Sequence, residues 1–275
     1  MAIVTISDEL GAYGPEIGQG LAKQLSYRYV DQELISEAAQ RYGLLEAKLS
    51  HLGESKPSLF ERFDAETRHY VLVTQATLFE FAAGDNVIIM GRGGQWLLRG
   101  IAHALRVRVA APFETRTRRL VAQLPGAVAV GPPPREVADS ARRVDGGKAG
   151  RMRYLYDVDI RDPKLYDIVL NTNQLDVPVA VDLLAGLLRS PGFAPTDAGR
   201  QLVADRALAA HVEVALARHA SSWATGVSVR AAAGFVTVEG PVDAEEIEPV
   251  VRNVTGVRGV TVRLVEAPPI PPFVA

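Results

Sequence analysis

The sequence contains no cysteine among its 275 residues. Disulfides, thiolate nucleophiles and cysteine-bound zinc are therefore excluded. No apolar run approaches the ~20 residues that cross a bilayer. The first residues also lack the basic and long apolar regions of a signal peptide, so we expect a cytoplasmic protein.

The sequence also lacks an excess of positive charge. Its formal net charge is −2, which argues against a general nucleic-acid binder. The five histidines show no metal-ligand spacing, and no serine lies in a nucleophile-elbow pattern. We therefore expect no nucleic-acid partner, no histidine-bound metal and no hydrolase chemistry.

A strand, a glycine-bearing turn and a helix start follow one another at the beginning of the chain. Residues 2–7 read as a buried strand, and residues 11–18 as a turn entering a helix. Such an arrangement binds anions through backbone N–H groups and the helix dipole. The lysine and the hydroxyl residue of a G-x-x-x-x-G-K-[ST] loop are absent, because those slots hold Gly14, Pro15 and Glu16.

Short apolar runs alternate with helical patterns over residues 1–190, which predicts an α/β fold with a mostly parallel sheet flanked by helices. The expected strands cover residues 3–6, 87–90, 106–110 and 167–170. The expected helices cover residues 15–25, 32–42, 58–83, 114–124, 136–144 and 178–188. The third helix opens on a capping box at residues 58–61.

Basic residues are concentrated in residues 106–153, which carry eleven basic and four acidic side chains. Such a block can focus field on an anionic ligand, although a solvated helical surface gives the same pattern. A proline-rich segment at 124–134 and a glycine-rich segment at 144–150 bracket this block. We expect both to be loops, acting either as a hinged lid or as plain flexible surface.

Polar residues follow the expected strands at the edge where parallel sheets bind ligands. Arg92 lies in a glycine-rich turn after residues 87–90, where its planar fork suits a phosphate. Asp31 either caps the helix that follows it or faces the same crevice. Asn171 and Thr172 either reach this edge or begin a loop.

The pattern changes after residue 190. Residues 191–203 read as a linker. A helix at 205–220, strands at 226–230 and 235–239, a helix at 244–254 and a strand at 259–265 then predict a small α+β domain of order αββαβ. Residues 268–275 form a proline-rich tail.

Six segments in the first 190 residues together resemble the cytidylate kinase-like family, a branch of the nucleoside monophosphate kinases with the P-loop fold. These segments are residues 3–7, 11–18, 29–35, 89–94, 107–116 and 162–172. The resemblance implies phosphoryl transfer from ATP to a nucleoside monophosphate, with CMP as the candidate acceptor and Mg²⁺ as the cofactor.

The resemblance also implies roles for individual residues. The first loop, with Gly11, Ala12, Tyr13 and Gly14, would hold the donor phosphates. Asp31 and Arg92 would lie on the acceptor side. The catalytic cations that neutralise the transferring group would be Arg116, Lys148 and Arg151.

The first loop departs from the family pattern at three positions. Asp8 and Pro15 stand where the family has arginines, and Tyr13 stands where it has a glycine. Phosphoryl transfer depends on positioning and charge neutralisation. Losing two loop cations could therefore weaken catalysis by orders of magnitude unless the lid compensates.

Residues 204–267 resemble a BON domain, on the features Asp205, residues 234–242 and residues 254–260. The resemblance implies a phospholipid or other small ligand and a peripheral contact with a membrane.

Three hypotheses remain open from the sequence. The chain is a nucleoside monophosphate kinase, a degenerate nucleotide or anion sensor coupled to the BON-like part, or a scaffold anchored through that part.

Overall fold

The computed structural model describes residues 2–42, 65–124, 133–219 and 227–265. Its elements are β1 (Ile3–Asp8), α1 (Gly14–Leu25), β2 (Arg28–Val30), α2 (Gln32–Tyr42), α4 (Ala65–Ala83), β3 (Val87–Met90), α5 (Gly94–Leu97), β4 (Ala104–Ala110), α6 (Phe113–Ala122), α7 (Arg135–Tyr156), β5 (Ile168–Asn171), α8 (Val177–Leu188), α9 (Asp197–His219), β6 (Ser228–Ala232), β7 (Phe235–Gly240), α10 (Ala244–Arg252) and β8 (Gly259–Leu264).

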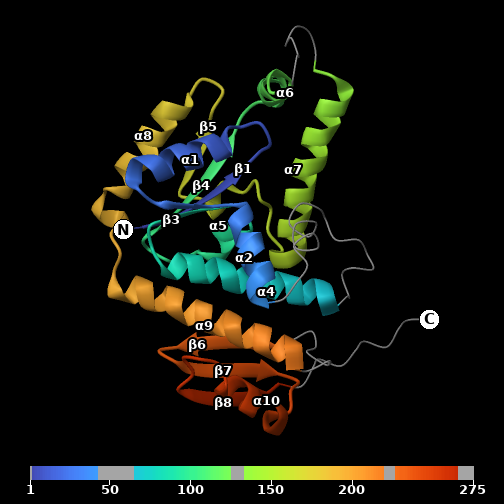
Figure 1. The fold of residues 1–275 in the computed structure, drawn as a ribbon, viewed down its shortest axis with the longest axis vertical. Coiled ribbons are helices and arrows are strands. Elements are labelled where there is room, and N and C mark those ends of the chain that lie inside the picture. Colours follow the sequence, from blue (N-terminus) through green and yellow to red (C-terminus); the bar gives the residue numbers. More distant parts are fainter. Residues whose placement is uncertain (1, 43–64, 125–132, 220–226, 266–275) are drawn as a thin grey trace, which may run out of the picture.

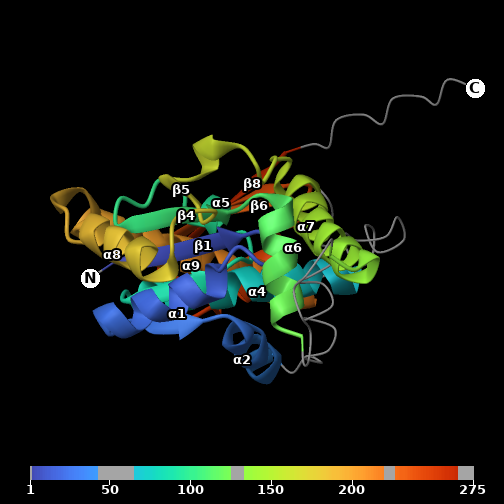
Figure 2. The same cartoon turned by 90° about the horizontal axis from the view of Figure 1, so that it is seen from above.

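The larger sheet has five parallel strands in the order β2-β3-β1-β4-β5. Its central strands β3, β1 and β4 are buried along most of their length, because helices cover both faces of the sheet (Figures 1 and 2). Val4 and Ile6 point to the face that α1 and α8 cover. Ile3 points to the opposite face, which packs against α2, α4, α5 and α9.

The predicted parallel α/β architecture is confirmed, with one strand missed. The missed strand β2 is only three residues long, which is too short to show the alternation of apolar and polar residues that predicts a strand. The helix predicted over residues 58–83 is observed from Ala65, and its proposed capping box lies outside the described residues. Most of the predicted proline-rich loop at 124–134 also lies outside them.

The predicted loop at residues 144–150 is wrong, because α7 runs unbroken from Arg135 to Tyr156. Each helical glycine costs about 1 kcal/mol relative to alanine. Contacts made by the helix offset this cost. Asp145 bonds to Leu10 in the turn after β1, Lys148 bonds to Asp8 at the end of β1, and Met152 is buried. The helix is thus held by tertiary contacts rather than by propensity.

The C-terminal elements follow the predicted order αββαβ as α9-β6-β7-α10-β8. β6 and β7 are antiparallel, and β8 pairs parallel with β7. The helix predicted to begin at residue 205 begins at Asp197, inside the stretch predicted as a linker. The likeness to a BON domain remains a prediction.

Helix α9 lies between the two sheets (Figure 1). One of its faces, including Val203 and Val214, enters the core of the larger sheet. The opposite face, including Leu208 and Val212, enters the core of the smaller sheet. The two sheets are therefore joined by shared packing.

No single helix in the described parts of the chain is long and apolar enough to cross a membrane, although α8 together with the 191–219 segment passes that test as a bent pair.

Candidate functional site

A cavity of about 370 Å³ opens at the carboxyl ends of β1 and β3, between α4 and α7. Its volume suits a small-molecule ligand. Four of the predicted site residues line it, namely Asp31, Arg92, Lys148 and Arg151, and Asp8 lines it as well. The wall opposite the sheet carries polar and aromatic side chains from α4 and α7, namely Tyr70, Thr74, Gln75 and Tyr156.

Arg92 is positioned by a tight turn after β3. Gly91, Arg92 and Gly93 all have positive φ, at 62°, 54° and 76°. The Gly91 N–H donates to the Ile6 carbonyl at 2.8 Å, which ties the turn to β1. A Cβ atom at Gly93 would lie 2.9 Å from the Tyr156 ring, so the close approach to α7 favours glycine there.

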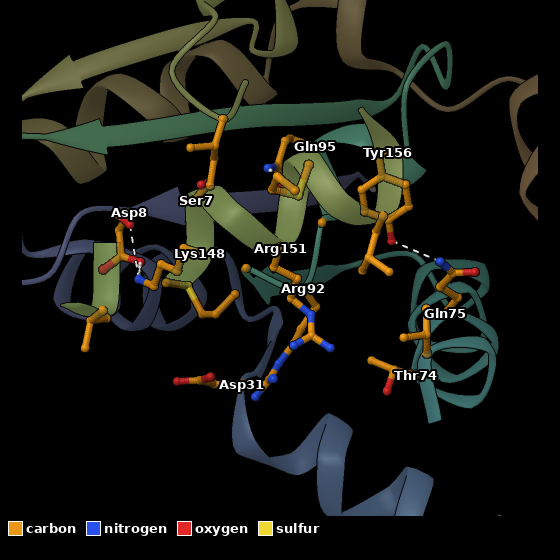
Figure 3. A pocket seen from close by; sticks show the side chains of 18 of the residues that line it. Ser7, Asp8, Asp31, Thr74, Gln75, Arg92, Gln95, Lys148, Arg151 and Tyr156 are labelled. Carbon is orange, nitrogen blue, oxygen red and sulfur yellow. Dashed lines mark hydrogen bonds and ion pairs between the residues drawn. The ribbon is translucent and has the colours of Figure 1, made fainter. Parts of the chain in front are cut away.

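Figure 3 shows Arg92 and Arg151 side by side in the cavity, with Asp31 nearby. Burial, together with the neighbouring Arg92 charge, lowers the pKa of Arg151 to about 10. Burial also raises the pKa of Asp31, against the opposing effect of Arg92. Two neighbouring guanidinium groups in a partly buried cavity have the chemistry to bind an anion with several oxygen atoms.

One face of α7 lines the cavity. Val144, Lys148, Arg151, Met152 and Leu155 all belong to this face, at the spacing of a helix. Tyr156 follows, and its hydroxyl accepts a hydrogen bond from Gln75 of α4 at 3.0 Å. This bond connects α7 with the far wall of the cavity.

The turn between β1 and α1 contains the four predicted phosphate-binding positions, Gly11, Ala12, Tyr13 and Gly14. Gly11 has φ 81° and Tyr13 has φ 68°, so this turn places a tyrosine in the left-handed region that usually favours glycine. A Cβ atom at Gly11 would lie 2.8 Å from the Arg116 carbonyl.

Thr172 and Arg119 brace this turn from the outside. The buried Thr172 hydroxyl donates to the Ala12 carbonyl at 3.0 Å and accepts from Arg119 Nη1 at 2.9 Å. The Arg119 guanidinium also lies 4.0 Å from the centre of the Tyr13 ring. Thr172 therefore lies at the predicted edge of the sheet, whereas Asn171 is exposed.

Carboxylates approach the same turn. Asp145 of α7 accepts from the Leu10 N–H at 3.0 Å and from Arg116 Nη1 at 2.7 Å. Asp8 pairs with Lys148, whose Nζ lies 2.8 Å from Asp8 Oδ1.

The structure thus brings four predicted site residues into one cavity and places Arg116 elsewhere. Arg116 is 6 % exposed and lies beneath the turn, where it also contacts Glu9 at 3.3 Å. Asp145 was missed because its segment was read as a loop. Its position three residues before Lys148 would have signalled a shared helix face.

Mg²⁺ in kinases is held by one or two carboxylates together with the substrate phosphates, so it does not need a cage of protein side chains. Within the described residues, no group of three His, Cys, Asp or Glu side chains could hold a metal ion.

Comparison with known proteins identifies the family. The model of the cytidylate kinase-like family matches residues 3–174. A cytidylate kinase of Methanococcoides burtonii is 25% identical over 192 residues, which cover 69% of this chain and 98% of the relative. A cytidylate kinase of Pyrobaculum aerophilum is 27% identical over 185 residues, covering 66% of this chain and 89% of the relative.

The fold is also found in a solved structure. The crystal structure of an uncharacterized protein from Eubacterium ventriosum ATCC 27560 matches with a TM-score of 0.52 at 16% identity, covering 69% of this chain and 99% of that chain. The chain belongs to the cytidylate kinase-like family, whose fold is that of the nucleoside monophosphate kinases.

Proposed function

We propose that this chain transfers a phosphoryl group from ATP to a nucleoside monophosphate bound in the cavity, with CMP as the first candidate. The observation that carries the proposal is the Arg92 and Arg151 pair, which lines the same cavity as Asp31, beside the turn after β1. A phosphate dianion between these guanidinium groups would relieve their mutual repulsion.

The roles of the residues follow from their places. Arg92 and Arg151 would hold the acceptor phosphate, one oxygen of which attacks the terminal phosphorus of ATP and releases ADP. Positioning and charge neutralisation account for most catalysis of this kind. Lys148, which lies between the cavity and the turn, would neutralise charge on the transferring group.

Turnover is the direct test. Purified full-length protein with ATP, Mg²⁺ and each nucleoside monophosphate in turn is expected to release ADP only when an acceptor is present. ADP formation that does not depend on any monophosphate, or no ADP with any of them, would count against phosphoryl transfer.

A second candidate function is nucleotide sensing without transfer. The observation that favours it is the pair of acids at the turn, Asp8 and Asp145, where cations would be expected for a triphosphate. A sensor predicts a rise in melting temperature that grows with ligand concentration, while no ADP forms.

We further propose that the C-terminal elements form a BON-like module that binds a phospholipid or small ligand. The order α9-β6-β7-α10-β8 supports this proposal. Because α9 belongs to both cores, the full chain should be used to test it. Co-sedimentation of the full chain with anionic or neutral phospholipid vesicles would support phospholipid binding by this module. If the chain co-sediments with neither kind of vesicle, phospholipid binding is ruled out.

A further inference from the structure

Asp145 takes two hydrogen bonds that an oxygen-bearing anion would take at the turn after β1. One carboxylate oxygen accepts from the Leu10 N–H at 3.0 Å, and the other accepts from Arg116 Nη1 at 2.7 Å. Arg116 Nη1 also donates to the Leu10 carbonyl at 3.0 Å. A backbone amide and a guanidinium held together in this way match the donors that bind a phosphate.

A second acid covers the start of α1. A Cβ atom at Gly14 would lie 2.4 Å from Asp8 Cβ and 2.8 Å from Asp8 Oδ2. The Asp8 side chain therefore lies directly against the first residue of the helix, where the dipole favours negative charge. Lys148 of α7 donates to both the side chain and the carbonyl of Asp8, at 2.8 and 3.1 Å.

The cations nearest the turn are already engaged by groups of this chain. Arg108 and Arg116 both lie near Glu9, at 3.4 and 3.3 Å. Lys148 pairs with Asp8, and Arg116 also pairs with Asp145. Arg119 donates to the Gly11 carbonyl at 3.4 Å and to Thr172. A polyphosphate arriving at this turn would therefore meet cations that groups of this chain already engage.

We propose that Asp145 is a built-in phosphate surrogate, which closes the turn to polyphosphate while α7 is docked as observed. A polyphosphate then has to displace the Asp145 carboxylate, and α7 has to shift from Leu10 and Arg116. The apparent affinity is lowered by the fraction of molecules in which the turn is open. This proposal concerns the donor side and rests on the proposed function.

The test uses full-length protein and inorganic tripolyphosphate, a probe without a base. Asp145→Ala removes the carboxylate that the Leu10 N–H and Arg116 Nη1 now bind. We therefore expect calorimetric titration to show that this variant binds tripolyphosphate about tenfold more tightly than the wild type does. The melting temperature without ligand should fall, because the buried Arg116 loses one of its two acidic partners and keeps only Glu9. A gain in affinity together with a loss of stability is not expected of a merely structural residue.

Asp139→Ala provides the matched control. Asp139 is an exposed aspartate on the same helix and pairs only with the surface residue Arg142 at 3.0 Å among the described contacts. Its replacement should leave tripolyphosphate affinity within about twofold of the wild type. Asp145→Asn keeps an acceptor for the Leu10 amide but loses the charge, so its gain in tripolyphosphate affinity should be intermediate. If Asp145→Ala does not fold, the affinity of Asp145→Asn is the test.

Unchanged or weaker tripolyphosphate binding by a folded Asp145 variant would overturn the proposal. A parallel titration with CMP separates this outcome from failure of the proposed function. If CMP still binds, only the surrogate role fails. If neither probe binds to any variant, both the surrogate role and the proposed function fail.

Discussion

Arg151 lies beside Arg92 in the cavity, and its lowered pKa of about 10 still leaves it charged at neutral pH. Arg151→Gln removes one of the two guanidinium groups and should weaken CMP binding by about tenfold or more. The size of the CMP-dependent rise in melting temperature measures this effect.

Arg153→Gln is the control at this scale, because Arg153 lies on the same helix with 68 % of its side chain exposed. It should respond to CMP as the wild type does. Equal losses in the two variants would mean that general positive charge, rather than the Arg92 and Arg151 pair, attracts the ligand.

Helix α7 is the element whose state decides the geometry of the site. Gly146 lies within it, and a Cβ atom there would meet nothing within 4 Å. Gly146→Ala should therefore raise the free energy of unfolding by up to about 1 kcal/mol, measured by urea denaturation. Gly94→Ala, in the short helix α5, should instead lower the free energy of unfolding, because its Cβ atom would lie 2.2 Å from Thr5 Oγ1. A loss of stability in Gly146→Ala would contradict a continuous helix.

The same element shows what could be predicted from the sequence. Strands such as β1 and β3 were predictable because burial on both faces gives apolar runs. The glycine pairs of α7 instead indicated a loop, because local propensity does not include the contacts that Asp145 and Lys148 make 135 and 140 residues away. Arg92 could be predicted from its place after a strand, whereas the pairing of Arg116 beneath the turn required tertiary structure.

At the scale of the whole molecule, α9 unites the two cores and carries Glu213. Burial raises the pKa of Glu213 to about 7. The native state therefore binds more protons than the unfolded state between about pH 4.5 and 7, so the free energy of unfolding should fall as pH rises through this range.

Glu213→Gln should remove this part of the pH dependence and raise stability at pH 8 by about 1–3 kcal/mol. Urea denaturation at pH 5 and pH 8 measures the difference. Glu246→Gln, at an exposed position in α10, should leave the wild-type dependence in place. If the free energy of unfolding of the wild type and of Glu213→Gln changes equally between pH 5 and pH 8, Glu213 is not the group that causes the pH dependence.

The central claim is that the cavity recognises a nucleoside monophosphate through its phosphate. Calorimetric titration of the full chain with CMP and with cytidine tests it most directly, because the two ligands differ only in that group. We expect CMP to bind at least about tenfold more tightly than cytidine, as charge-assisted bonds to Arg92 and Arg151 require. Equal affinity for the two ligands, or no heat from either, would contradict it.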